Sequence, residues 1–151
     1  MLSRHIHEKG ALSIKELIER VKGSPNFQKA GAITIFIGVV RGENPRKEKV
    51  RKLEVEAYNE GADKALSKIC QDLKKRKGIV DVQIHHFVGE FNVGEDLVYV
   101  VVAGSHRADV FPVFREAVER YKLEAPIFKK EYVITKKGGE KAYWVAEAEE
   151  E

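Results

Sequence analysis

The stretch VDVQIHHFVGEFNVGEDLVYVVVA, residues 80–103, decides the fold, because it holds two strands with no helix between them. Residues 80–88 and 97–103 are rich in β-branched and aromatic side chains, and a glycine-bounded segment, residues 89–94, joins them. The second of these segments is almost wholly apolar, which is typical of a buried strand. We therefore expect two strands that follow each other directly, the second of them buried.

Three amphipathic helices are expected around these strands. Ser13 and Glu16 form a capping box, and apolar residues follow at helical spacing until a Gly-Ser-Pro stop. A second helix is predicted over residues 62–73, where small and aliphatic side chains mark one face. A third is predicted over residues 110–121, with Pro112 in its first turn, where the missing N–H is not needed.

Further strands complete the pattern. Residues 2–8 are expected to form a short strand, and residues 32–40 are so apolar that they predict a central strand buried on both faces. Residues 53–57 alternate between apolar and charged side chains, and residues 127–135 and 141–145 are predicted to form a hairpin. The order β-α-β-β-α-β-β-α-β-β predicts an α+β domain, with helices packed on a mixed, mainly antiparallel sheet and a C-terminal β-hairpin.

The composition indicates one domain. The 151 residues include seven Phe, five Tyr and one Trp, which argues against disorder. We expect a single domain over residues 1–146 and an acidic tail over residues 147–151. A lone cysteine excludes an internal disulfide and indicates a reducing cytoplasm, and no apolar run approaches the ~20 residues that cross a bilayer. The abundance of lysine and glutamate, 18 and 19 residues, is typical of heat-adapted proteins.

Positive charge is concentrated in two segments. The net charge is +3, but residues 41–52 carry a local +4 and residues 122–141 a local +3. This pattern indicates an anionic substrate or partner, although charge alone favours the simpler interpretation of two solvated lysine-rich loops. An RNA-binding domain stays open as an alternative, but the sequence lacks the aromatic set with which such domains stack bases.

The cysteine and the histidines give no sign of a catalytic thiol or a metal site. Cys70 lies on the apolar face of the second helix with no basic residue placed to activate it, so we expect a packed core thiol. His85 and His86 are adjacent in a strand and point to opposite faces, so they cannot share a metal. His5 and His7 could share a face, but no ligand set accompanies them. The sequence therefore predicts neither a bound metal nor a cofactor.

Residues whose side chains could bind a ligand or take part in catalysis stand at the ends of predicted elements. Phe36 and Gly38 lie in an apolar strand that ends at Arg41. His106 and Arg107 stand where a buried strand meets the start of a helix, a position that favours anions.

Two lysines add to this set. Lys122 closes the third helix, and Lys129 follows Pro126 between apolar residues. Partial desolvation at such a place suits a lysine to catalysis, whereas the simpler interpretation is a helix-terminal lysine and a strand lysine that reaches the solvent.

Taken together, these residues resemble the large, catalytic subunit of molybdopterin synthase. The matching elements occur in the family's order from about residue 30 to residue 146, and they are Phe36-x-Gly38-x-Val40-Arg41, Glu56-x-Tyr58, Gly89-Glu90, Gly94-Glu95, Ser105-His106-Arg107, Lys122, Ala125-Pro126-x-Phe128-Lys129-Lys130-Glu131 and Trp144-Val145. Two positions depart from the family's usual pattern: Phe87 stands where an arginine is frequent, and Phe128 where a tryptophan is common.

The resemblance implies a fold, a reaction and partners. The fold would be α/β hammerhead-like, and the reaction would install two sulfurs on cyclic pyranopterin monophosphate to form the dithiolene of molybdopterin, for molybdenum cofactor biosynthesis. The sulfur would arrive as the C-terminal Gly-Gly thiocarboxylate of a small ubiquitin-like subunit. The assembly would be a heterotetramer, with a central homodimer of this chain and one small subunit at each end. Neither nucleic acid nor a membrane would take part.

The resemblance also implies roles for individual residues. Lys122 and Lys129 would be catalytic, and both would contact substrate. The other expected substrate-binding residues are Val39, Val40, Arg41, His106, Arg107, Lys130 and Glu131, with Phe36 lining the pocket. The substrate would sit near the dimer interface and so contact both copies of the chain. A non-catalytic paralogue that binds the same partner is the other alternative.

Overall fold

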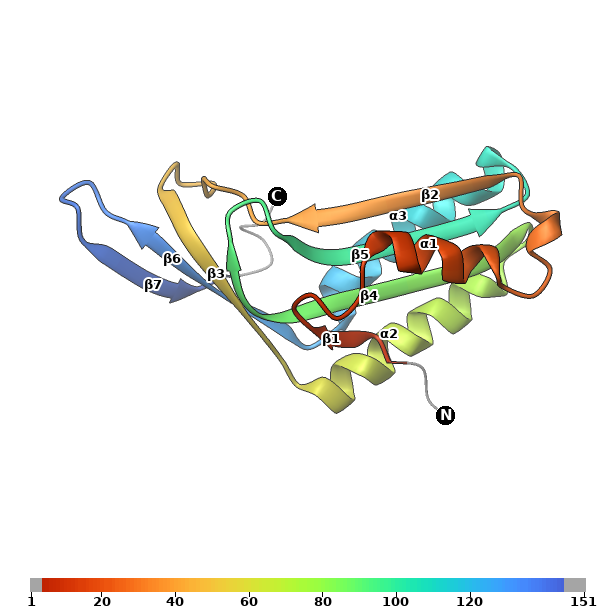
Figure 1. Cartoon of the computed structure of the whole chain (residues 1–151), viewed down its shortest axis with the longest axis horizontal. Helices are drawn as coiled ribbons and strands as arrows, with labels where there is room; N and C mark the ends of the chain where they lie inside the picture. Colours follow the sequence, from red (N-terminus) through yellow and green to blue (C-terminus); the bar gives the residue numbers. More distant parts are fainter. Residues whose placement is uncertain (1–3, 146–151) are drawn as a thin grey trace.

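The computed structural model describes residues 4–145, and the predicted acidic tail over residues 147–151 lies outside them. The observed elements are β1 (Ile6–Glu8), α1 (Ile14–Lys22), the short 3₁₀ helix η1 (Phe27–Lys29), β2 (Ala32–Val39), β3 (Lys49–Ala57), α2 (Asn59–Lys74), β4 (Ile79–Asn92), β5 (Asp96–Gly104), α3 (Arg107–Glu124), β6 (Ile127–Ile134) and β7 (Glu140–Trp144). The strands form one seven-stranded sheet in the order β2-β5-β4-β3-β6-β7, with β1 beside β4 (Figure 1). The pairings are antiparallel except for β1 with β4, so the predicted α+β fold and its C-terminal hairpin are confirmed.

β4 is the strand that joins the two halves of the sheet. Its first part pairs with β5 from Ile79 to His86, and its last part pairs with β3 from Gly89 to Asn92. Gly89 stands at the change of partner with φ of +126°, a value that L side chains rarely adopt. The sequence predicted that this strand ends at residue 88. That prediction was wrong, because the glycine bends the strand without ending it.

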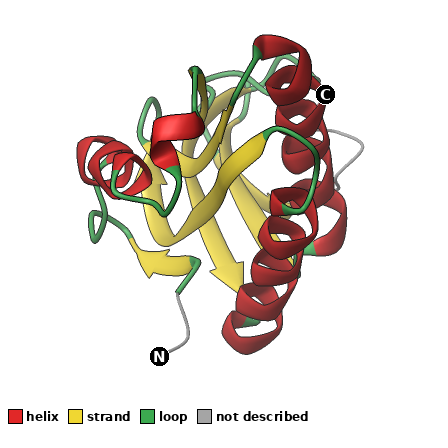
Figure 2. Ribbon diagram, turned by 90° about the vertical axis from the view of Figure 1, so that its right-hand side faces the viewer, coloured by secondary structure: helices red, strands yellow, loops and turns green. Residues whose placement is uncertain are grey.

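The helices cover the half of the sheet that β1, β2, β4 and β5 form. α2 and α3 lie side by side on one face, and α1 lies on the other (Figure 2). α1 begins as the capping box predicts, with the N–H of Glu16 donating to Ser13 Oγ at 3.1 Å. The core between these layers includes Leu17 of α1, Leu66 of α2 and Val100 of β5. No helix within residues 4–145 is long and apolar enough to cross a membrane.

Two other expectations were wrong. β2 is an edge strand of the sheet, and its outward residues Ile35, Ile37 and Val39 are 39–50% exposed, so the apolar run is not a central strand buried on both faces. Pro112 lies in the second turn of α3, because that helix begins three residues earlier than its apolar pattern suggests. At that position proline removes one helical hydrogen bond instead of occupying a place where none is made.

Candidate active site

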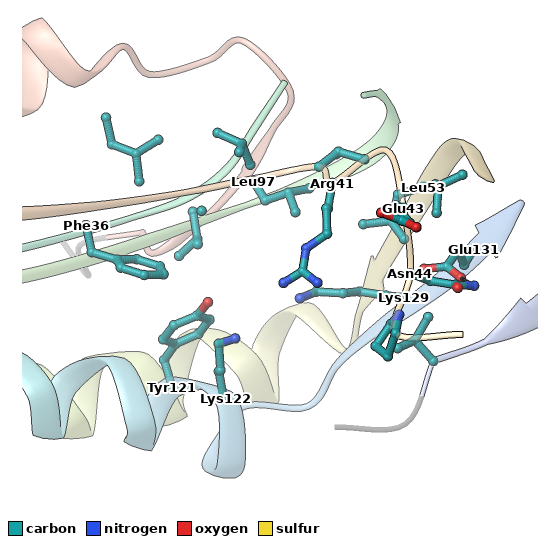
Figure 3. Close-up of a pocket in the computed structure, with 18 residues that line it drawn as sticks. Phe36, Arg41, Glu43, Asn44, Leu53, Leu97, Tyr121, Lys122, Lys129 and Glu131 are labelled. Atoms are coloured by element: carbon teal, nitrogen blue, oxygen red, sulfur yellow. Dashed lines mark hydrogen bonds between the residues drawn. The ribbon is translucent and has the colours of Figure 1, made fainter. Parts of the chain in front are cut away.

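A cavity of about 390 Å³ lies where the end of β2, the C-terminal end of α3 and the middle of β6 meet (Figure 3). Phe36, Val40 and Leu97 supply apolar lining, and Tyr121 faces them from α3. An added Cβ at Gly38 would lie 2.6 Å from Val98 Cγ1, so only glycine lets β2 pass this close to β5. The cavity therefore combines a packed apolar wall with an open polar side.

Three cationic side chains from separate parts of the chain point into this cavity. Arg41 follows β2, Lys122 lies in the last turn of α3, and Lys129 lies on β6, and their charged ends are directed toward one another (Figure 3). Like charges gathered in one concave site repel each other, and an anion placed among them relieves that repulsion. The arrangement suits a small molecule with concentrated negative charge, such as a phosphate ester.

Strand alternation decides which residues of β6 reach the cavity. Lys129 and Glu131 line it, and Phe128 and Lys130 point to the opposite face of the sheet. On that face the Lys130 ammonium lies 5.8 Å from the ring centre of Trp144. Lys130 therefore does not contribute to the cavity within one copy of the chain.

His106 and Arg107 lie at the opposite end of α3 from Lys122. His106 is the N-cap residue of α3, and Lys122 follows fifteen residues after the first helical residue, Arg107. At 1.5 Å rise per residue, about 22 Å of helix separates the two ends. Within one copy of the chain, these two predicted substrate-binding residues do not meet the cluster of Arg41, Lys122 and Lys129.

The remaining predicted residues lie together at one place in the structure. Phe36, Val39, Val40, Arg41, Lys122, Lys129 and Glu131 all line the same cavity. The part of the wall that follows Arg41 consists of three residues that no sequence pattern singles out, Glu43, Asn44 and Pro45. In the sequence, the segment Gly42-Glu43-Asn44-Pro45 indicates only the end of the preceding strand and the start of a charged loop.

The thiol and the two central histidines are buried, and none of them lines the cavity. Cys70 is 6% exposed and belongs to the hydrophobic core, which confirms a packed core thiol, and this burial raises the pKa of the thiol to about 12. Burial, followed by the charges of Lys129 and Lys122, lowers the pKa of His86 to about 3. His85 points to the other face of the sheet and meets His7, with 2.8 Å between His7 Nε2 and His85 Nδ1. No group of side chains within the described part of the chain forms a metal site.

The fold and the cavity define an α+β protein with a pocket lined by three cationic side chains, and comparison with known proteins identifies the family. A family model described as MoaE protein matches residues 7–124. A protein of Haloferax volcanii named "Probable molybdopterin synthase" is 38% identical over 80% of this chain, and a "Molybdopterin synthase catalytic subunit" of Pyrococcus abyssi is 38% identical over 88% of it. The chain therefore belongs to the MoaE family, so the predicted family and the prediction of an enzyme are confirmed.

The coverage of these relatives differs. The chain spans 46% of the Haloferax protein and 83% of the Pyrococcus protein. Among solved structures, a molybdopterin synthase from Staphylococcus aureus shares 28% identity and a TM-score of 0.79, over 97% of this chain and 98% of that one. A complex of subunits 1 and 2 of molybdopterin-converting factor from Helicobacter pylori shares the fold, with 24% identity and a TM-score of 0.68 over 83% of this chain and 82% of that one.

Proposed function

We propose that this chain transfers sulfur from the C-terminal thiocarboxylate of a small ubiquitin-like subunit to cyclic pyranopterin monophosphate, forming the dithiolene of molybdopterin. The observation that carries the proposal is the convergence of Arg41, Lys122 and Lys129 in one cavity with an apolar wall. The cations suit a phosphate and a developing negative charge, and the apolar wall suits a flat pterin ring.

Each residue has a proposed role that follows from its position. Arg41 holds the phosphate through its planar guanidinium, which can donate two parallel hydrogen bonds. Lys122 lies beside the thiocarboxylate and acts as general acid and base, and Lys129 binds substrate and neutralises negative charge as the sulfur is transferred. Val39 and Val40 shape the pocket through their backbone, and Glu131 flanks the second lysine on β6.

The sulfur must come from another molecule under this proposal. Cys70 is buried, and its raised pKa leaves the thiol protonated at neutral pH, so this residue is a poor sulfur carrier. The Helicobacter pylori structure is titled as a complex of two subunits, which supports a small partner for this chain as well. A Gly-Gly tail is slender enough to enter a cavity of this size. A reducing cytoplasm is the location that suits a thiocarboxylate and an unpaired cysteine.

The exposed side of β2 supports the proposed homodimer. Ile35, Ile37 and Val39 form an apolar stripe on an edge strand, and such a stripe favours cover by another protein surface. If a two-fold axis crosses the middle of the stripe, the start of each β2 lies beside the end of the other. Ala32 at that start pairs with Gly104, which is close in sequence to His106 and Arg107. These two residues of one copy would then approach the cavity of the other, so the substrate would contact both.

The test is a single-turnover assay with a thiocarboxylated small subunit and cyclic pyranopterin monophosphate. We expect the unmodified chain to form molybdopterin, and Lys122→Ala and Lys129→Ala each to lower the rate at least about a hundredfold with folding intact. Lys137→Ala, in the exposed turn of the hairpin, is the matched control for loss of a lysine. Binding of the small subunit without turnover by the unmodified chain would instead support the non-catalytic paralogue, and near-normal rates in both lysine variants would exclude the proposed mechanism.

A further inference from the structure

Asn44 is a buried polar residue outside the set that the sequence predicts. It lies in the segment between β2 and β3, three residues after Arg41, and only 6% of its surface is exposed. A buried amide is costly unless its donors and acceptors are all used. The partners of this side chain therefore indicate what the residue does.

The amide oxygen of Asn44 closes a tight turn. Asn44 Oδ1 accepts the backbone N–H of Arg46 at 3.0 Å and that of Glu48 at 2.9 Å. The backbone N–H of Asn44 donates to the carbonyl of Glu48 at 3.1 Å, and Lys47 between them has φ of +62°. One side-chain atom thus fixes the course of the segment that carries Arg41 away from β2.

The amide nitrogen of Asn44 reaches two strands that are distant in the sequence. It donates to Glu131 Oε1 on β6 at 2.8 Å and lies 2.9 Å from the hydroxyl of Tyr143 on β7. It also lies 3.0 Å from Glu48 Oε1, which accepts a hydrogen bond from the Tyr143 hydroxyl as well. The guanidinium of Arg46 covers the ring of Tyr143 at 4.4 Å, so the turn is held against the hairpin by a compact group of contacts.

The turn and the hairpin form two walls of the same cavity. Arg41, Glu43 and Asn44 line it from one side, and Lys129 and Glu131 line it from the other. We propose that Asn44 is a positioning residue that ties these two walls together and so sets the spacing between the guanidinium of Arg41 and the ammonium of Lys129. The tie follows from the hydrogen bonds alone, and its effect on catalysis rests on the proposed function.

Asparagine is the residue type that this position requires. Its oxygen faces two backbone N–H donors, and its nitrogen faces two carboxylates and a hydroxyl, so the orientation of the amide is fixed by its partners. Aspartate has the same shape, but it would place a second oxygen against Glu48 and Glu131. Alanine would remove the acceptor of the turn's two backbone N–H groups and the donor to the carboxylate of Glu131.

The first test is backbone hydrogen exchange in the unmodified chain, in Asn44→Ala and in Asn44→Asp. We expect the amides of Arg46 and Glu48 to exchange at least about tenfold faster in both variants, because they lose their acceptor or its support from the hairpin. The control is Asn26→Asp, the same chemical change at an exposed residue with no capping hydrogen bond from its side chain. This measurement needs neither substrate nor partner.

The second test is kinetic. With cyclic pyranopterin monophosphate as the varied substrate, we expect KM to rise about tenfold in Asn44→Asp and kcat to change less than about threefold. Lys122 and Lys129 remain anchored on α3 and β6, whereas Arg41 loses its fixed position. A general loss of folding would instead lower the active fraction and leave KM unchanged.

The third test is a double-mutant cycle between Asn44→Asp and Glu131→Gln. In the double variant the amide that replaces the carboxylate of Glu131 can donate to the new carboxylate at position 44, which restores the hydrogen bond with its direction reversed. We expect Asn44→Asp to raise KM and the rate of amide exchange in both backgrounds. Each of these increases should be at least about threefold smaller in the Glu131→Gln background than in the unmodified chain.

Four outcomes separate this inference from the proposed function. Unchanged exchange at residues 46 and 48 in Asn44→Ala, or equal effects of Asn44→Asp in both backgrounds, would overturn the tie. Faster exchange with unchanged KM in an active enzyme would overturn its role in positioning Arg41. If the unmodified chain transfers no sulfur, the proposed function fails, and exchange and direct binding of cyclic pyranopterin monophosphate still decide whether Asn44 holds the cavity together.

Discussion

The two central histidines should make the stability of this protein depend on pH. His85 and His86 are each about 1% exposed, and burial is the main reason why the pKa of each falls to about 3. The charges of His7, His5 and Arg20 add to the effect at His85. His85 Nε2 lies 2.9 Å from Gln83 Oε1, a contact that the neutral ring satisfies as a donor while its other nitrogen faces His7.

The size of the effect follows from proton uptake by the unfolded chain. An unfolded histidine binds a proton below pH 6.5, whereas these two stay neutral in the folded protein down to about pH 3. Their contribution to stability is therefore complete above pH 6.5 and is lost as the pH falls toward 3. At pH 5 each lies 1.5 units below 6.5, which corresponds to about 2 kcal/mol per histidine and about 4 kcal/mol for both. A domain of this size has about 5–15 kcal/mol in total.

The assay is urea unfolding between pH 7.5 and 5.0 at one protein concentration, so that any association stays constant. The lower limit of the interval stays above 4.5, the ordinary pKa of a glutamate, and the pKa of Glu48 and of Glu95 is lowered from that value. We expect the free energy of unfolding to fall by about 4 kcal/mol, and by about half as much in His86→Gln. A fall of less than about 1 kcal/mol in the unmodified protein would show that the folded state takes up these protons and would refute the reasoning.

Three further predictions concern the thiol, the edge strand and the arginine. Cys70→Ala should keep sulfur transfer within about twofold and lower stability by about 1–2 kcal/mol, and loss of turnover in a stably folded variant would contradict the core role of the thiol. Ile37→Asp should convert the proposed dimer to a monomer in light scattering, because it places a charge in the apolar stripe of β2, and a dimer that persists would place the interface elsewhere. Arg41→Lys keeps the charge but loses the planar donor pair, so KM for cyclic pyranopterin monophosphate should rise about tenfold, and an unchanged KM would remove Arg41 from phosphate binding.

The order of the elements could be predicted from the sequence because it depends on local patterns. The capping box at Ser13 and the alternation after residue 52 each reflect contacts within one element, and the structure has those elements in place. The position of β2 in the sheet could not be predicted in this way. A wholly apolar strand is expected in the middle of a sheet, and an edge strand has the same pattern when its outward side is suited to cover by another protein surface. The bend at Gly89 was missed for a similar reason, since a glycine that bends a strand and one that ends it have the same sequence signal.

The cationic part of the site was predictable, and its framework was not. Arg41, Lys122 and Lys129 are side chains at recognisable places: after an apolar strand, at the end of a helix, and beyond a proline. Asn44 becomes informative only through Glu131 and Tyr143, which lie 87 and 99 residues further along the chain. No local pattern records such contacts, so a buried polar residue in a loop has the same sequence signal as a turn.

Under the proposed function, this chain has no usable thiol, so it cannot supply the sulfur itself. Cys70 is buried and stays protonated, so under the proposed function the nucleophile enters with the partner's tail and leaves with the product. The chain then has to hold two anions, a thiocarboxylate and a phosphate, at reacting distance although they repel each other. Cations on three separate parts of the chain offset that repulsion only if those parts keep their spacing, because the attraction between a cation and an anion weakens with distance. One requirement therefore has two parts. The charges of Arg41 and Lys129 make the approach of two anions favourable, and the hydrogen bonds of Asn44 keep those two charges at a fixed spacing.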